Sequence, residues 1–88
     1  MKVFDYRGMK YVYILRSVSW PEKTYVGVTG NLRRRLQQHN TGQSEHTKGF
    51  IPWKVETYLA FSDSEKAKAF ERYLKMGGGW RYAKRRLI

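Results

Sequence analysis

The chain has 88 residues, of which 41% are hydrophobic and 16% aromatic, enough for one small domain with a single core. It has no cysteine, which excludes disulfides and thiolate metal sites, and no apolar run approaches the roughly 20 residues of a membrane-spanning helix. Eighteen Lys and Arg against seven Asp and Glu give a net charge of +11, which favours nucleic acid over an anionic membrane or an acidic protein as the partner. No signal peptide is recognisable, so we expect a cytoplasmic location.

The first part of the chain predicts a β-hairpin. Residues 1–9 have weak periodicity and are expected to form an N-terminal extension of a single domain over residues 10–88. Tyr11–Arg16 alternates between its two faces and Thr24–Val28 is rich in β-forming residues, which predicts two strands. Their short link, residues 17–23, favours antiparallel pairing.

The middle of the chain predicts a helix, a loop and a third strand. Thr29-Gly30-Asn31 is a helix-entry signal for Leu32–Asn40, and Gly42 closes that helix. Gln43–Pro52 is polar and contains glycine, which indicates a surface loop, and Trp53–Phe61 is a predicted strand. Simple alternation would place four of its residues on one face: Trp53, Val55, Thr57 and Leu59.

The last part of the chain predicts two helices. Ser62-Asp63-Ser64-Glu65 has the pattern of a capping box, and the helix behind it is expected to run to about Lys75. Gly77-Gly78-Gly79 should break that helix, and Trp80–Leu87 predicts a short basic terminal helix. The order is therefore ββαβαα. This order indicates an α/β (α+β) fold, in which helices flank a small three-stranded antiparallel sheet.

The helix before Gly77 carries a carboxylate on its apolar face. Ala67, Phe70 and Leu74 stand at i, i+3 and i+7 and form the predicted core-facing stripe. Glu71 falls in the same stripe, where no lysine is expected to neutralise it. An unpaired buried charge is costly, so we expect Glu71 to lie near the rim, to pair with an arginine or to bind a metal.

The preceding helix carries three consecutive arginines and a histidine. At about 100° per residue, Arg35 and His39 border the core-facing stripe, whereas Arg34 points into solvent. Arg35 is therefore the arginine placed for a site beside the sheet. Arg33 and Arg34 are either general phosphate contacts or part of a solvated face, and His39 taken alone is typical of a structural histidine.

The hairpin supplies two phenols and a gap. Tyr13 and Tyr25 can lie on the same face of the sheet, and Gly27 has no side chain on that face, which is expected to leave room for a ligand. A single tyrosine in a small sheet is more often a core residue than a catalytic one. Two phenols beside a rim arginine and a misplaced carboxylate instead predict a functional site.

These motifs resemble the GIY-YIG nuclease family, in particular its small stand-alone bacterial members of the UPF0213 type. The first motif is present as Tyr11-Val12-Tyr13, with Tyr11 in place of the glycine, and the second as Tyr25-Val26-Gly27. The pattern continues in chain order through Thr29, Asn31-Leu32, Arg35, His39, Gly42, Trp53, Ala67 to Glu71, and Leu74-Lys75. The resemblance covers Lys10 to Lys75, and Gly77–Gly79 replaces the more charged connector that the family leads us to expect.

The resemblance implies a metal-dependent endonuclease that hydrolyses DNA phosphodiester bonds. It implies that Glu71 is the direct protein ligand of one Mg²⁺ or Mn²⁺ ion and that Arg35 holds the phosphate. Tyr25 or Tyr13 would help to deprotonate the attacking water, and His39 would orient a tyrosine or assist proton transfer. A phenol has an ordinary pKa of about 10, so Arg35 and the metal would have to lower it.

Further basic residues and Gly27 are expected to contact the nucleic acid. The expected contacts are Gly27, Arg33, Arg34, Lys75, Arg81, Lys84, Arg85 and Arg86. The alternative is a nucleic-acid-binding protein on the same fold that cuts weakly or not at all. In either case we expect a monomer or weak homodimer that does not act on a membrane.

Overall fold

A computed structural model describes residues 8–88 of the chain. Its single sheet is antiparallel and has the strand order β2-β1-β3. The strands are β1 (Lys10–Ser17), β2 (Thr24–Thr29) and β3 (Trp53–Phe61). The predicted three-stranded antiparallel sheet is confirmed, with β1 and β2 slightly longer than expected. Residues 1–7 of the predicted N-terminal extension lie outside the described residues, and the proposed boundary before residue 10 stays a prediction.

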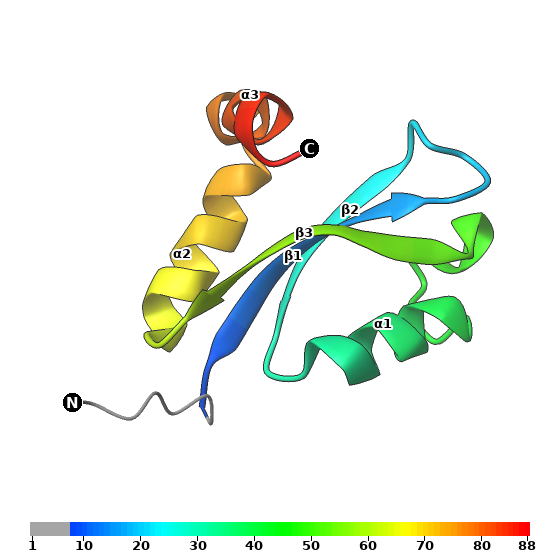
Figure 1. The fold of residues 1–88 in the computed structure, drawn as a ribbon, viewed down its shortest axis with the longest axis horizontal. Coiled ribbons are helices and arrows are strands. Elements are labelled where there is room, and N and C mark those ends of the chain that lie inside the picture. Colours follow the sequence, from blue (N-terminus) through cyan, green and yellow to red (C-terminus); the bar gives the residue numbers. More distant parts are fainter. Residues whose placement is uncertain (1–7) are drawn as a thin grey trace.

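Helices cover both faces of this sheet. Figure 1 shows α1 on one face, with α2 and α3 together on the other. The helices are α1 (Leu32–Asn40), α2 (Ser64–Leu74) and α3 (Gly77–Arg86), with a short 3₁₀ turn η1 (Lys48–Phe50) before β3. The element order confirms the predicted α+β fold. Among residues 8–88, no helix is both long and apolar enough to cross a membrane.

Each face of the sheet has its own apolar cluster. On the side of α2 and α3 the cluster contains Val12, Ile14, Val26, Ala67, Leu74 and Ala83. On the side of α1 it contains Tyr13, Leu15 and Trp53, with the partly buried Leu32 and Leu36 of the helix. The alternation predicted for β1 and β2 is therefore confirmed. It places both hairpin tyrosines on the side of α1.

A β-bulge interrupts the pairing of β1 with β3. Ile14 pairs with Thr57 whereas the next residue, Leu15, pairs with Val55, so Glu56 is an extra residue in β3. Val55 packs on the α1 side, while Thr57 faces α3. The prediction that Val55 and Thr57 share one face is therefore wrong, because the bulge reverses the alternation between them.

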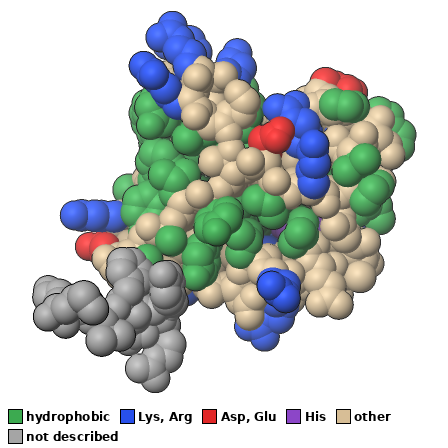
Figure 2. Space-filling view, in the orientation of Figure 1, with side chains coloured by type: hydrophobic (Ala, Val, Ile, Leu, Met, Phe, Trp, Pro, Cys, Tyr) green, Lys and Arg blue, Asp and Glu red, His purple; other side chains and the backbone are tan. Residues whose placement is uncertain are grey.

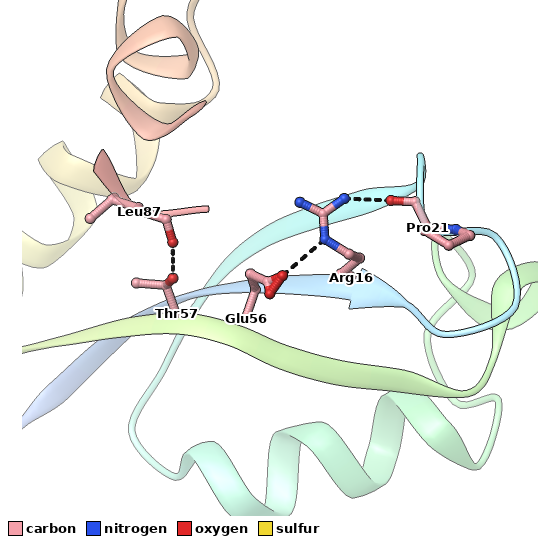
Figure 3. Close-up of polar contacts among 5 residues, drawn as sticks. All are labelled: Arg16, Pro21, Glu56, Thr57 and Leu87. Atoms are coloured by element: carbon pink, nitrogen blue, oxygen red, sulfur yellow. Dashed lines mark hydrogen bonds and ion pairs between the residues drawn. The ribbon is translucent and has the colours of Figure 1, made fainter. Parts of the chain in front are cut away.

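The residues at the bulge make side-chain contacts on the face of the sheet that α3 covers. Figure 3 shows Glu56 and Thr57 on the side of β3 that faces α3. The Thr57 hydroxyl donates to the backbone carbonyl of Leu87 just after α3. Arg16 Nε donates to Glu56 Oε1 at 3.0 Å, and Arg16 Nη1 donates to the carbonyl of Pro21 in the β1–β2 loop.

The start of α2 differs from the predicted capping box by one residue. The N-cap is Asp63, whose side chain accepts from the backbone N–H groups of Glu65 and Lys66 at 2.9 and 3.2 Å. A carboxylate in this position satisfies two N–H groups that the helix cannot pair internally. Helix α2 therefore begins at Ser64, and the predicted reciprocal Ser62–Glu65 box is not formed.

The three glycines belong to α3 rather than to a break before it. Lys75 is the C-cap of α2, Met76 is extended and interrupts the helical path, and Gly77 is the first residue of α3. A Cβ at Gly79 would lie 1.7 Å from the carbonyl oxygen of Tyr73 in α2. Only glycine permits this close crossing of the two helices, so the predicted start of the terminal helix at Trp80 is wrong.

Candidate active site

Tyr13 lies at the centre of a buried cluster on the α1 side of the sheet. It stands in the middle strand β1 and is 1% exposed. Its register partner in β2 is Gly27, and a Cβ at that position would lie 2.4 Å from the Tyr13 hydroxyl. The Tyr13 ring therefore occupies the room that Gly27 provides. The expectation that a ligand would use this room is wrong.

His39 connects Tyr13 to the loop after α1. It is fully buried near the end of the helix, with Nε2 2.9 Å from the Tyr13 hydroxyl and Nδ1 2.7 Å from Thr47 Oγ1. We assign the imidazole proton to Nδ1, where Thr47 Oγ1 accepts it, because the Thr47 hydroxyl can direct its own hydrogen towards the Ser44 carbonyl 3.5 Å away. His39 Nε2 then accepts a hydrogen bond from the Tyr13 hydroxyl. The network holds a neutral imidazole in one tautomer.

Burial sets the protonation of both members of this pair. Burial, together with the nearby Arg35 guanidinium, lowers the pKa of His39 to about 4. Burial raises the pKa of Tyr13 above 10, an effect that Arg35 opposes and that Tyr25 and Glu71 reinforce. Arg35 thus lowers the pKa of Tyr13 as expected, but burial raises it by more. At neutral pH, Tyr13 is a positioned hydrogen-bond donor.

Tyr25 is the more accessible of the two phenols. It lies in the edge strand β2 and is half-buried. Its ring centroid is 5.0 Å from that of His39 and 6.4 Å from that of Tyr13. Lys75 Nζ lies 6.0 Å from the Tyr25 ring centroid. Solvent and a substrate can therefore approach this cluster through Tyr25.

Glu71 enters the cluster from α2. Its side chain is 15% exposed, and its Oε2 pairs with Nζ of Lys75, one turn further along the helix. The expectation that no lysine neutralises Glu71 is wrong, because residues four apart on a helix are neighbours and the lysine side chain reaches back. The predicted position near the rim is correct. The carboxylate is close enough to Tyr13 to raise the pKa of its phenol.

Arg35 is the half-buried arginine of α1, whereas Arg33 and Arg34 are exposed, as their spacing predicts. Its Nη1 donates to Gln38 Oε1 at 2.9 Å, which holds the guanidinium along the helix. Beside it, a polar hollow of about 510 Å³ also contains Lys10 and Arg34 on its wall. The Arg35 charge, which acts on both Tyr13 and His39, thus lies next to an open basic recess.

The structure brings together the five residues with predicted catalytic roles. They come from four elements, β1, β2, α1 and α2, and are Tyr13, Tyr25, Arg35, His39 and Glu71. The other predicted basic contacts are exposed: Arg33, Arg34, Lys75, Arg81, Lys84, Arg85 and Arg86. Figure 2 shows Lys and Arg side chains gathered over α3. These basic residues are therefore accessible to a large anion.

Thr47 is a member of the cluster that sequence reasoning missed. The predicted surface loop Gln43–Pro52 buries Thr47 completely, and Ser44 is only 8% exposed. The carbonyl of Thr47 accepts from Trp53 Nε1 at 2.8 Å, while its hydroxyl meets His39. A threonine in a polar loop gives no signal of such a role, because the composition of the loop indicates exposure and the contact with His39, eight residues earlier, forms only in the folded chain.

Within the described residues, the cluster offers little to a metal beyond Glu71. No group of three or more His, Asp or Glu side chains comes together in residues 8–88. Both ring nitrogens of His39 are already engaged, so it is not free to be a ligand. A single carboxylate that leaves the other positions to water suits Mg²⁺ or Mn²⁺, which prefer oxygen ligands. This donor set fits one such ion if Glu71 releases Lys75.

Comparison with known proteins agrees with this geometry. Residues 9–78 match the GIY-YIG catalytic domain family. The chain is 37% identical over 68 residues to a UPF0213 protein of Clostridium perfringens, a match that covers 76% of this chain and 71% of that protein. It is 48% identical over 50 residues to the structure-specific endonuclease subunit SLX1 of Debaryomyces hansenii, covering 50% of this chain but only 14% of that protein. The solution structure of a UPF0213 protein from Bacillus halodurans superposes with a TM-score of 0.54 and 25% identity, over 90% of this chain and 86% of that one.

Proposed function

Because the chain belongs to the GIY-YIG catalytic domain family, we propose that it is an endonuclease that hydrolyses DNA phosphodiester bonds with one divalent metal ion. The observation that carries the proposal is the meeting of Tyr13, Tyr25, Arg35, His39 and Glu71 at the β2 edge of the sheet. The net charge of +11 supplies the attraction for a polyanion. The structure-specific SLX1 relatives support a nucleic-acid substrate.

Arg35 is proposed to hold the scissile phosphate. Its guanidinium is half-buried, is fixed by Gln38 and borders the recess next to the cluster. A preorganised cation stabilises negative charge as it builds up on the phosphoryl oxygens, without having to reorganise. Arg34, its exposed neighbour, is proposed to contribute to binding alone.

Tyr25 is proposed to meet the attacking water. Tyr13 is 1% exposed, has a raised pKa and already donates to His39. Tyr25 is half-buried at the sheet edge, with its ring against His39 and Lys75 Nζ nearby. In this proposal Tyr25 orients the attacking water and, in its phenolate form, accepts the proton that the water loses, while the Tyr13–His39–Thr47 network holds the surrounding side chains in place.

Glu71 is proposed to hold the metal ion. When bound, such an ion neutralises charge on the phosphate and stabilises the departing oxygen. Lys75, which is half-exposed, would exchange its contact with Glu71 for one with the nucleic-acid backbone. Its place beside both Glu71 and Tyr25 puts Lys75 next to the proposed reaction.

One observation favours the alternative, a nucleic-acid-binding protein that cuts weakly or not at all. Glu71 is already neutralised by Lys75, so the carboxylate does not need a metal to offset its burial. The test is a cleavage assay on labelled duplex, single-stranded and branched DNA with Mg²⁺ or Mn²⁺. Binding without cleavage on all three would establish the alternative. RNA of the same forms would show whether the sugar matters.

Two arginine variants test the proposed geometry. Arg35→Ala should lose cleavage by about 10²–10³-fold at saturating DNA, the usual effect of removing one preorganised donor. Arg34→Ala is the matched control on the same helix and should weaken binding while cutting at the wild-type rate. Equal cutting by the two variants at saturating DNA would reject the role of Arg35.

The predicted monomer or weak homodimer and the cytoplasmic location stay predictions.

A further inference from the structure

A second hollow adjoins the proposed active site. It has a volume of about 400 Å³ and lies between β2 and the connection from α2 to α3. Its wall includes Tyr25, Leu74, Lys75, Met76, Gly77 and Trp80. Tyr25 and Lys75 also belong to the active-site cluster, so the hollow and the cluster share one wall.

The start of α3 keeps this hollow open. Gly79 lets α3 cross close to α2, and Trp80 then packs against the apolar cluster on that side of the sheet. A Cβ at Gly77 would have no atom within 4 Å, so no side chain fills the space in front of it. Met76 is 61% exposed although it is apolar. An accessible apolar wall beside a cationic site is therefore built into the α2–α3 connection.

The chemistry of this wall selects its occupant. Aromatic and thioether groups from Tyr25, Trp80 and Met76 suit the flat face of a ring, and Lys75 suits an anion attached to that ring. No Asp or Glu is among the described residues that line the hollow. A nucleotide combines a flat heterocycle with a phosphate, and bases stack on aromatic side chains whatever their sequence.

We propose that this hollow binds one unpaired nucleobase next to the phosphodiester that is cut, a refinement that rests on the proposed nuclease function. A base inside a duplex is stacked on both faces and paired along one edge, so it cannot enter the hollow. Flaps, overhangs and open junctions present such a base without the cost of unpairing it. The substrate class is therefore nucleic acid with an unpaired nucleotide at the cleavage position.

A neighbouring hollow could receive the nucleic-acid strand beyond the bound base. It has a volume of about 420 Å³ and shares Thr24 and Trp80 with the first one. Lys84 and Arg16 also line it, together with Glu22. A nucleic-acid strand whose base packs against Trp80 would thus have Lys75 in the first hollow and Lys84 in the second. Cations on both sides fit the two phosphates that flank a single nucleotide.

The test compares two DNA ligands that differ by one base. The first is a labelled hairpin with one unpaired nucleotide at its junction, and the second has an abasic nucleotide at that position. Binding is measured by fluorescence anisotropy without metal, so cleavage is not needed. The wild-type chain should bind the base-bearing ligand about fivefold tighter or more, the lower end of what stacking of one base on an aromatic side chain contributes. Equal affinity for the two ligands would overturn the proposal.

Two glycine variants show whether the hollow is responsible. Neither Gly77 nor Gly78 has a positive φ, so both accept a side chain in the first turn of α3. Gly77→Leu narrows the hollow and should remove the preference for the base. Gly78→Leu is the matched control, because Gly78 does not line the hollow and its Cβ would meet only the end of Arg81 at 3.9 Å. Loss of the preference in both variants, or in neither, would overturn the assignment.

A third variant covers the case in which Gly77→Leu does not fold. Met76 is exposed, so Met76→Glu places a carboxylate at the mouth of the hollow. It should weaken the binding of the base-bearing ligand more than the binding of the abasic one. Equal weakening of both ligands would count against the hollow. The two proposals fail separately. A preference for the base without cleavage would reject the nuclease function, whereas cleavage without any preference would reject the base-binding hollow.

Discussion

Acid pH should destabilise this protein through His39, because the unfolded chain accepts a proton there before the folded chain does. The imidazole is fully buried, with both nitrogens hydrogen-bonded, and its pKa falls from 6.5 to about 4 on folding. Between these two values the unfolded chain binds the proton and the folded chain does not. Stability is therefore complete above about pH 6.5, falls as the pH drops towards 4, and the loss saturates below that. The full loss is about 3 kcal/mol.

Urea unfolding at several pH values between about 7 and 4 measures this effect, with tryptophan fluorescence as the signal. Carboxylates also titrate in acid, so the quantity of interest is the difference in pH slope between wild type and variant. His39→Asn should start less stable and lose about 3 kcal/mol less than wild type over this range. His46→Asn is the matched control, since His46 is the second histidine of the chain and is exposed. A wild-type slope in His39→Asn would refute the reasoning.

Four further outcomes follow from the same geometry. Gly27→Ala should displace the Tyr13 ring and cost about 1–3 kcal/mol in thermal or urea unfolding, and an unchanged stability would show that the ring moves freely. Thr47→Val should cost about 1–3 kcal/mol by leaving His39 Nδ1 without its hydrogen-bond partner, whereas a neutral effect would contradict a stabilising Thr47–His39 hydrogen bond. Glu71→Gln should abolish Mn²⁺-dependent cleavage. It should change the metal-free stability by no more than about 1 kcal/mol, because its partner Lys75 is half-exposed. A loss of several kcal/mol would instead favour a purely structural role. DNA affinity should fall with salt at a log–log slope of about −0.9 per phosphate contacted, and a flat titration would contradict electrostatic binding.

The elements of this fold could be predicted from the sequence because their signals are local. The bounds of α1 and β3 agree with the prediction residue for residue, and the two faces of β1 follow from its alternation. Each signal depends only on neighbours within one element. The spacing of Glu71 to Ala67 and Leu74 places it on the core-facing stripe, but leaves open whether it lies near the rim, pairs with an arginine or binds a metal.

The features that could not be predicted depend on contacts between distant segments. The extra residue Glu56 in β3 has a meaning only opposite β1, and nothing in the local alternation indicates it. Gly79 would weaken an isolated helix, yet α3 includes it because a larger residue would collide with Tyr73 of α2. Thr47 lies in a stretch whose composition indicates a surface loop. In the folded chain its hydroxyl contacts His39 of α1 and its carbonyl accepts from the Trp53 ring.

The two tyrosines illustrate why the sequence left the choice of the reacting phenol open. Alternation assigns Tyr13 and Tyr25 to the same face, but it says nothing about where a strand stands in the sheet. The order β2-β1-β3 places Tyr13 in the middle strand, where burial raises its pKa and its hydroxyl donates a hydrogen bond to His39. The same order leaves Tyr25 at an edge, within reach of solvent and beside Lys75. Strand order therefore separates a buried phenol from an accessible one, and the accessible phenol lines the hollow that we propose binds a base.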